Sequence, residues 1–219
     1  MVLDVKICGL KTPEAITAAL SGGASHVGFI FFPKSPRNID PVEAGRLRED
    51  ARGRAKAVAV TVDADDAMLN AIVEAMSPDM LQLHGKETPE RVAEVKARYG
   101  LPVMKALSVR EASDLQAIAR YRGVADRFLL DAKPPAGSEL PGGNGIPFDW
   151  RLLAGLESGL DYMLSGGLNA ANIGEALRLT NPPGLDISSG VESAPGVKDP
   201  ALIEGFFRAV RTAQARSVA

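Results

Sequence analysis

Short apolar runs alternate with longer amphipathic segments from one end of the chain to the other. The runs are four to six residues long and rich in β-branched side chains, which is typical of strands buried on both faces of a parallel sheet. Eight such runs are the expected strands: Leu3 to Cys8, His26 to Phe31, Ala57 to Val62, Met80 to Leu83, Val103 to Leu107, Arg127 to Asp131, Tyr162 to Ser165 and Leu185 to Ser188.

The segments between these runs are rich in Ala, Leu, Glu and Arg, as helices are. Several begin with a residue that caps a helix, followed by a proline suited to the first helical turn, as in Thr12-Pro13, Asp40-Pro41, Thr88-Pro89 and Asp199-Pro200. The expected helices are Pro13 to Leu20, Pro41 to Arg52, Asp66 to Met76, Pro89 to Arg98, Glu111 to Tyr121, Asp149 to Leu156, Ala170 to Leu179 and Pro200 to Ala215.

Eight strand–helix units in 219 residues average about 27 residues each, the size of a compact βα unit. Strands that alternate with helices predict a parallel sheet covered by helices, and eight units favour a closed (β/α)8 TIM barrel. An open doubly wound sheet is the main alternative. No Gly-x-Gly-x-x-Gly follows the first run, so a dinucleotide site is not indicated. Without a linker along the chain, we expect one domain over 1–219.

The segment 132–147 is dense in proline and glycine and is too long for a routine βα turn. Loops of this length in a compact domain are commonly lids. We therefore expect it to be a mobile active-site loop.

Composition narrows the possible partners. The chain is 46% hydrophobic and 24% charged with a net charge of -2, so it lacks the basic surplus that attracts nucleic acid or anionic membranes. No apolar stretch is long enough to span a membrane and no signal peptide is evident. A single cysteine fits a reducing compartment, and two histidines give metal binding little support. We expect a cytoplasmic protein, a monomer or homodimer, acting on small molecules.

In TIM barrels the active site lies at the carboxyl ends of the strands. His26 begins a run, away from that rim, and is expected to be structural. The acidic residues Asp63, Asp65, Asp66, Glu87 and Glu90 are expected at helix starts and on solvated faces. The candidates at or just beyond the ends of the runs are Cys8, Arg37, Asp63, His84, Lys105, Ser108, Asp131, Ser165, Ser188 and Ser189.

Two glycine-containing segments near the end of the chain predict a phosphate site. They are Ser165 to Asn169 and Asp186 to Glu192. Glycine lets backbone N–H groups approach an anion closely, a helix N-terminus adds positive partial charge, and a phosphate commonly binds in this corner of such barrels. The expected phosphate-binding residues here are Gly166, Gly167, Ser188, Ser189 and Gly190.

The residue types alone leave two interpretations of Cys8 and of Arg37 open. A lone cysteine at the end of a strand is either packing or a reactive group. Its reference pKa of about 8.5 means that a nearby positive charge, such as Lys6 or a substrate group, would favour the thiolate. Arg37 is either a solvated side chain or a fork that holds a carboxylate through two hydrogen bonds.

Several segments in this order resemble the phosphoribosylanthranilate isomerase family over the whole chain. They are Lys6 to Leu10, Gly28 to Arg37, Leu81 to Gly85, Leu129 to Asp131 with Gly142 to Gly145, Ser165 to Leu168, and Asp186 to Glu192 with Pro195 to Asp199.

The resemblance implies an Amadori rearrangement, which needs no redox cofactor and no metal. Asp131 would be the general acid that protonates the ring oxygen of the ribose, and Cys8 the base that removes the C2′ proton. Arg37 would bind the anthranilate portion, and Gln82 and His84 would line the substrate site. Gly143 and Gly145 would join the phosphate site.

Three alternatives remain. An isomerase of histidine synthesis performs the same rearrangement with two aspartates, but Cys8 stands where that family has Asp. A bifunctional enzyme serving both pathways is the second. A noncatalytic phosphosugar-binding barrel, which would keep Gly166, Gly167 and the segment 188–190 but need neither Cys8 nor Asp131, is the third.

Overall fold

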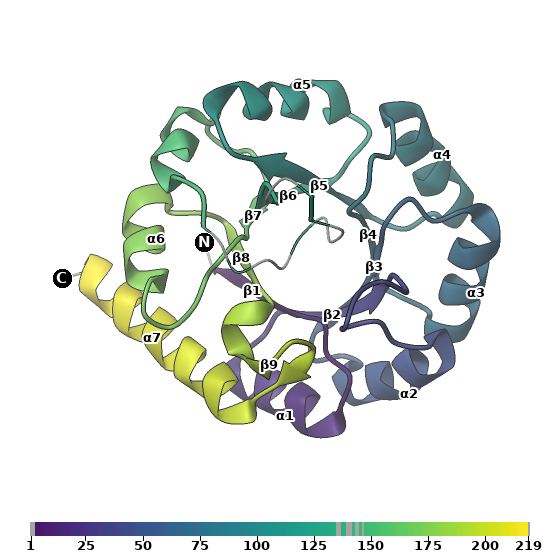
Figure 1. The fold of residues 1–219 in the computed structure, drawn as a ribbon, viewed down its shortest axis with the longest axis horizontal. Helices are drawn as coiled ribbons and strands as arrows, with labels where there is room; N and C mark the ends of the chain where they lie inside the picture. Colours follow the sequence, from purple (N-terminus) through teal and green to yellow (C-terminus); the bar gives the residue numbers. More distant parts are fainter. Residues whose placement is uncertain (1–2, 135–136, 139–141, 143–144, 146, 219) are drawn as a thin grey trace.

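A computed structural model describes residues 3–134, 137–138, 142, 145 and 147–218. Eight parallel strands close into a barrel, and the helices form a ring outside it (Figure 1). The (β/α)8 prediction is confirmed, and the open doubly wound sheet is wrong because β1 pairs with β8, with Lys6 beside Asp186 in the register. The segment 132–147, predicted to be a mobile loop, lies partly outside the described residues.

The apolar runs form the strands to within two residues of their predicted ends. The barrel strands are β1 (Asp4–Cys8), β2 (His26–Phe31), β3 (Lys56–Thr61), β4 (Met80–Leu83), β5 (Val103–Val109), β6 (Arg127–Ala132), β7 (Tyr162–Leu164) and β8 (Gly184–Ile187).

The predicted caps hold the helices that follow them. Thr12 and Thr88 accept hydrogen bonds from the backbone N–H three residues later, and Asp40 accepts from the N–H groups of Val42 and Glu43. The helices are α1 (Pro13–Gly22), α2 (Pro41–Ala51), α3 (Asp66–Met76), α4 (Pro89–Tyr99), α5 (Ala117–Tyr121), α6 (Ile173–Thr180) and α7 (Pro200–Val218).

Three predicted helices differ from the structure. The segment from Glu111 to Tyr121 begins as the 3-10 helix η1 (Ala112–Gln116) because the Asp114 carboxylate takes the backbone N–H groups of Arg110 and Glu111. Only the 3-10 helix η2 (Trp150–Gly155) forms in place of the predicted sixth helix. The helix after β7 begins three residues late, since the side chains of Asn169 and Asn172 make a turn before it.

Two apolar layers surround the sheet. The larger lies between the strands and the outer helices, and the smaller fills the barrel. The interior cluster consists of Cys8, Val58, Val60, Met80, Met104, Ala106, Leu129 and Met163. Lys6, Gln82, Asp131 and Asp186 are among the buried polar side chains of the barrel strands. The interior is therefore polar around the base of the predicted site.

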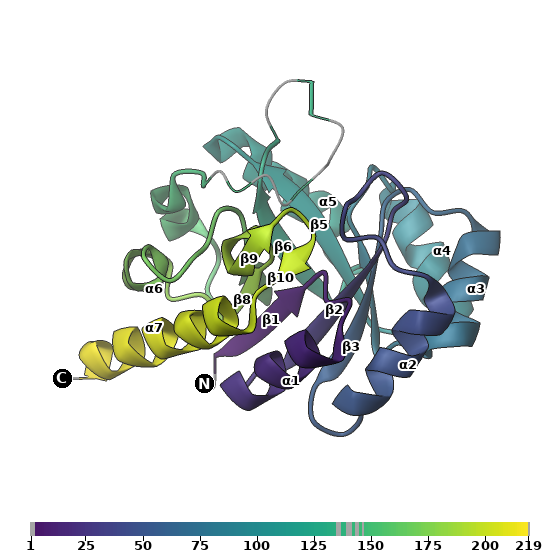
Figure 2. The ribbon, with the colours of Figure 1, turned by 60° about the horizontal axis from the view of Figure 1, so that its bottom comes forward.

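A small antiparallel hairpin after β8 was not predicted. It joins β9 (Glu192–Ala194) to β10 (Val197–Lys198), and it follows the 3-10 helix η3 (Ser189–Val191). The hairpin lies beside the carboxyl end of β1 (Figure 2). This places Glu192 and Lys198 next to the functional rim of the barrel.

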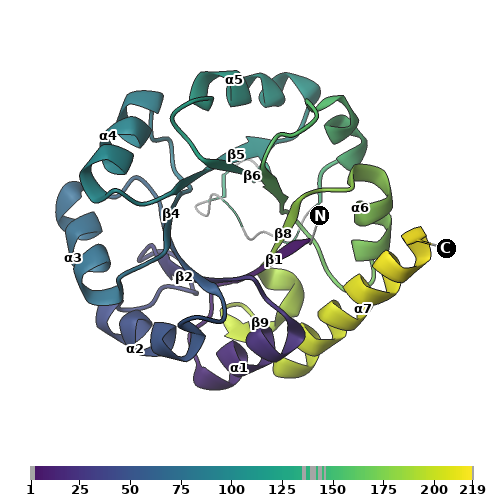
Figure 3. The same ribbon diagram turned by 180° about the vertical axis from the view of Figure 1, so that it is seen from behind.

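Helix α7 lies along the outside of the barrel between α6 and α1, so the end of the chain covers its beginning (Figure 3). Leu202 on this helix is partly exposed, whereas Phe206 and Phe207 are buried and meet edge to face. Within the described residues, none of the helices combines the length and the apolar character that crossing a bilayer requires.

Candidate active site

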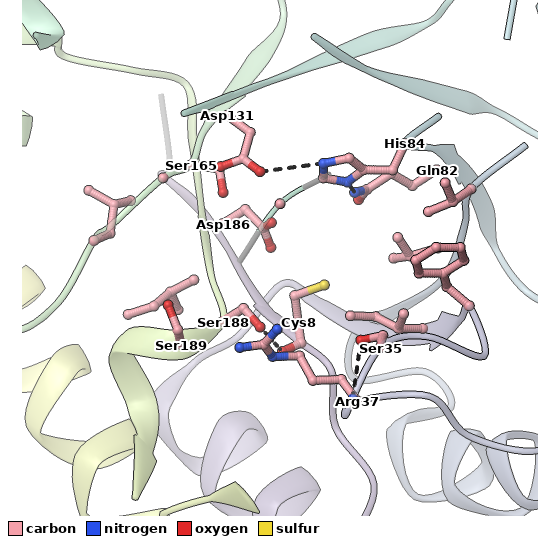
Figure 4. A pocket seen from close by; sticks show the side chains of 18 of the residues that line it. Cys8, Ser35, Arg37, Gln82, His84, Asp131, Ser165, Asp186, Ser188 and Ser189 are labelled. Atoms are coloured by element: carbon pink, nitrogen blue, oxygen red, sulfur yellow. Dashed lines mark hydrogen bonds and ion pairs between the residues drawn. The ribbon is translucent and has the colours of Figure 1, made fainter. Parts of the chain in front are cut away.

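A cavity opens at the carboxyl ends of the strands (Figure 4). The predicted residues Cys8, Arg37, Gln82, His84, Asp131, Gly166, Gly167, Ser188 and Ser189 all line it. The structure thus gathers residues from six separate segments of the sequence into one pocket.

Cys8 ends β1 with its sulfur atom directed into this cavity (Figure 4). The thiol has little exposure, at 4% for the residue. Gly28 on the neighbouring strand makes room for it, because a Cβ there would lie 3.0 Å from Sγ and 2.9 Å from the Lys6 Cε atom. Glycine at this position therefore permits Cys8 and Lys6 to pack side by side.

The Lys6 ammonium lies beneath the thiol and donates to Asp186 Oδ1 at 2.9 Å. Burial raises the pKa of Cys8; the positive charge of Lys6 opposes this rise, and the Asp186 carboxylate adds to it. The pKa remains above its ordinary value, so the free protein holds Cys8 as a thiol. Lys6 favours the thiolate, as the sequence predicted, but its charge does not offset the effect of burial on the pKa of Cys8.

Asp131, on β6, faces Cys8 across the cavity and points toward His84. Its Oδ2 atom lies 3.4 Å from Nε2 of His84, and Oδ1 accepts from the backbone N–H of Ala132. Gln82 lies 3.0 Å from Nδ1 of the same ring. If the Gln82 amide donates to Nδ1, the proton of the neutral ring is on Nε2 and faces Asp131. His84 and Gln82 therefore orient the carboxyl group.

Gly142 covers Asp131 from the loop after β6. A Cβ atom at this position would lie 2.3 Å from Asp131 Oδ2 and 2.8 Å from His84 Nε2. No side chain fits there. The backbone of residue 142 consequently forms part of the wall around the carboxyl group.

Loops after β7 and β8 meet at one corner of the cavity, where phosphate binding was predicted. Gly166 and Gly167 have φ angles of 87° and 67°, which favour glycine. Neither N–H group donates to another backbone group within the described residues. Gly190 packs so closely that a Cβ would lie 1.9 Å from the Leu168 carbonyl oxygen. The backbone N–H groups of Gly166 and Gly167 can therefore donate to a ligand at this corner.

The other two predicted phosphate residues are Gly143 and Gly145. Gly145 is exposed and does not line the cavity, although a Cβ there would lie 3.6 Å from Oγ of Ser189. Gly143 lies outside the described residues.

Arg37 lines the cavity, but one edge of its guanidinium is engaged within the protein. Nε and Nη2 donate to the two oxygens of Glu192 at 2.8 and 2.9 Å. The aliphatic part of the side chain packs on Gly9, where a Cβ would lie 2.8 Å from Cδ. Arg37 is thus a buried, fixed side chain and not a solvated one.

Sequence reasoning missed Asp186 and misplaced two other residues. Asp186 lines the cavity, and the alternation of side chains along β8 puts it on the same face as Ser188. Lys105 instead points outward and donates to Glu87 at 2.9 Å. The prediction that Glu87 lies on a solvated face is wrong, because it also accepts from the backbone of Asp63 and Gly85. Among the described residues, no three potential metal-ligating side chains come together.

Residues 5–209 match the family N-(5′phosphoribosyl)anthranilate (PRA) isomerase. The chain is 77% identical over 214 residues to an N-(5′-phosphoribosyl)anthranilate isomerase of Mesorhizobium japonicum, with 98% of each chain covered. It is 71% identical over 219 residues to that of Brucella canis, covering 100% of this chain and 99% of the relative.

Solved structures agree with the sequence relatives. A phosphoribosyl anthranilate isomerase from Thermotoga maritima has a TM-score of 0.86 at 32% identity, covering 96% of this chain and 100% of that one. A phosphoribosyl anthranilate isomerase in complex with reduced 1-(o-carboxyphenylamino)-1-deoxyribulose 5-phosphate has a TM-score of 0.83 at 31% identity, with the same coverage. The chain therefore belongs to the N-(5′-phosphoribosyl)anthranilate isomerase family.

Proposed function

We propose that this protein converts N-(5-phosphoribosyl)anthranilate to 1-(2-carboxyphenylamino)-1-deoxyribulose 5-phosphate in tryptophan biosynthesis, with Asp131 as the general acid and Cys8 as the general base. The observation that carries the role assignment is their common cavity, with Cys8 on β1 and Asp131 on β6. In this proposal the enzyme works in the cytoplasm, as a monomer or homodimer.

The reaction begins at the ribose ring. Asp131 gives its proton to the ring oxygen as the bond from that oxygen to C1′ breaks, and the lone pair of the anthranilate nitrogen forms the Schiff base. The Cys8 thiolate then removes the C2′ proton, and the electron pair of the C–H bond moves to give the enolamine. Tautomerisation yields the ketone. The rearrangement is redox-neutral overall, and apart from opening the ring it proceeds by proton transfers.

The barrel order supports this division of labour. Strands β7 and β8 lie between β6 and β1. A phosphate held at Gly166, Gly167, Ser188 and Ser189 would therefore lie between the acid and the base, with the sugar extending over the cavity. Backbone N–H groups would bind the phosphate oxygens, as the architecture of such barrels favours.

The aromatic end of the substrate needs a cation for its carboxylate. We assign this role to Arg37, which lines the cavity near Cys8 and Ser188. Glu192 occupies its Nε edge, so the substrate carboxylate would approach another edge of the guanidinium. The reduced product bound to the solved relative carries both a phosphate and a carboxyphenyl group, which is the ligand chemistry this site would accept.

Cys8 distinguishes this assignment from the histidine-pathway isomerase, whose two-aspartate chemistry would place a carboxylate at that position. The other carboxylate next to the thiol is Asp186, and its nearest partner is Lys6, at 2.9 Å. Because that ion pair lies beneath Cys8, we assign Asp186 to the environment of the base.

The test is a fluorescence assay with freshly formed phosphoribosylanthranilate, whose conversion removes the anthranilate-type signal. We expect Asp131→Asn and Cys8→Ala each to lower kcat by about 10²- to 10⁴-fold, while the affinity for the reduced product analogue changes little. Turnover near that of the unaltered protein in either variant would reject that residue's role.

Asp50→Asn provides the control. Asp50 lies on the exposed face of α2, far from the cavity. Its substitution removes the same charge as Asp131→Asn. Its kinetics should be those of the unaltered protein. If the unaltered protein binds the analogue but causes no signal decay above the spontaneous rate, the noncatalytic phosphosugar-binding barrel replaces this proposal.

A further inference from the structure

The hairpin after β8 brings a buried charge network against the substrate site. Glu192 and Lys198 have side-chain exposures of 4% and 2% and form an ion pair with each other. Neither residue lines the cavity, and the proposed chemistry uses neither of them. Two charges removed from water in this way cost free energy unless they are well paired.

Glu192 is the centre of the network. One oxygen accepts from Arg37 Nε and from the Lys198 ammonium, and the other accepts from Arg37 Nη2 and from the backbone N–H of Gly196 at 3.2 Å. Burial would raise the pKa of Glu192, but the hydrogen bond from Arg37 and the charge of Lys198 outweigh burial and lower the pKa. The carboxylate is therefore ionised and holds Arg37 through two charged hydrogen bonds.

The hairpin also fixes the chain that carries Arg37. Gly196 has a φ of 80° and packs on Pro36, the residue before Arg37. A Cβ at position 196 would lie 2.4 Å from the Pro36 carbonyl oxygen. On the other side, Gly9 meets the stem of Arg37 directly after Cys8. Arg37 is therefore held on the side of Gly9 and through its neighbour Pro36, which limits how its guanidinium can turn.

Lys198 connects the same network to the phosphate corner. Its ammonium donates to the carbonyl oxygen and to Oγ of Ser188, at 3.1 and 3.2 Å. Ser188 Oγ in turn donates to the carbonyl oxygen of Cys8 at 3.0 Å. The pair of Glu192 and Lys198 is thus connected to Arg37, which is assigned to the substrate carboxylate, to Ser188 at the phosphate corner, and through Ser188 to the backbone of Cys8.

We infer that Glu192, supported by Lys198, is a positioning and specificity residue that orients Arg37 toward the substrate carboxylate. This inference rests on the proposed function. It predicts that removing the fork from Glu192 to Arg37 weakens recognition of the carboxylate and leaves the sugar phosphate end of the ligand bound as before.

The experiment measures the affinity of two ligands for each variant by calorimetry. One is the reduced 1-(2-carboxyphenylamino)-1-deoxyribulose 5-phosphate, and the other is its phenylamino counterpart without the carboxylate. The ratio of the two dissociation constants is the carboxylate preference. We expect Glu192→Gln, which keeps the shape, to lower this preference at least tenfold, while the affinity for the phenylamino ligand changes less than threefold.

Two further variants complete the test. Glu192→Asp keeps the charge but is one methylene too short to reach both Arg37 nitrogens, so it should lower the preference as well and serves if Glu192→Gln does not fold. In an Arg37→Ala background the preference should already be lost, and adding Glu192→Gln should lower it no further.

Glu87→Gln is the matched control, because Glu87 is equally buried and also pairs with a lysine, but on the outer side of the barrel. It should leave the carboxylate preference unchanged. An unchanged or increased preference in Glu192→Gln, or an equal loss of affinity for both ligands, would overturn the inference. Failure of the unaltered protein to bind either ligand would instead count against the proposed function.

Discussion

His26 should make the stability of this protein depend on pH. It begins β2 at the end of the barrel opposite the cavity and is 2% exposed. Its Nδ1 lies 2.8 Å from Ser25 Oγ, and its Nε2 is buried without a hydrogen-bond partner among the described residues. Burial lowers the pKa of His26 from 6.5 to about 4, against the opposing charge of Asp4.

The magnitude follows from the two pKa values. The unfolded chain protonates His26 near pH 6.5 and the folded protein only near pH 4, so the unfolded state binds more protons between these values. The contribution of His26 to the free energy of unfolding is therefore fully present above pH 6.5, and it is lost as the pH falls toward 4. One pKa unit corresponds to about 1.4 kcal/mol, which gives about 3 kcal/mol in total and about 2 kcal/mol at pH 5.

The assay is urea unfolding of the unaltered protein and of His26→Asn at pH 8, 6.5 and 5. We expect His26→Asn to be less stable at pH 8, because it loses buried packing. The difference in unfolding free energy should shrink by about 2 kcal/mol at pH 5, since Asn does not titrate. Ser25→Ala keeps the imidazole and should retain the pH dependence. A difference between His26→Asn and the unaltered protein that stays constant from pH 8 to 5 would refute the reasoning.

Two further predictions concern the cavity. Because burial raises the pKa of Cys8, kcat/KM should still increase with pH above 9, and Lys6→Met should move the inflection to higher pH; an inflection near neutrality in the pH–rate profile would contradict this. Gly142→Ala should lower kcat/KM at least about tenfold with an unchanged melting temperature, because the new methyl group would displace the Asp131 carboxyl; normal kinetics would show that residue 142 does not shape the site.

The strands could be predicted because their signal is local. Each apolar run is short, ends at a turn and needs only burial on both faces. The predicted helices Glu111 to Tyr121 and Asp149 to Leu156 were less well predicted. In the first of them, Asp114 competes for backbone N–H groups at the start of the segment. The hairpin after η3 is tied to the rest of the barrel by the ion pair between Arg37 and Glu192, which no window of sequence reveals.

The candidate site was predictable to the extent that a barrel places the ends of all its strands at one rim. That rule selected Cys8, His84 and Asp131 correctly as cavity residues. It failed for Lys105, because the rim rule does not state which face of the strand a side chain occupies. The engagement of Arg37 by Glu192 joins residues 155 positions apart and needs the folded geometry.

The contacts around Cys8 have a consequence for protein synthesis. Lys6 bonds to Asp186, and the carbonyl oxygen of Cys8 accepts from Ser188, so each contact joins residues 180 positions apart. A ribosome that adds about 5–20 residues per second needs on the order of 10–40 s to cover that distance. During this interval the nascent chain carries its only thiol without the partners that surround it in the finished barrel. The protein should therefore become active only when β8 pairs with β1 and closes the barrel. An activity measurement during synthesis would report the number of completed barrels and not the number of chains that have begun to emerge from the ribosome.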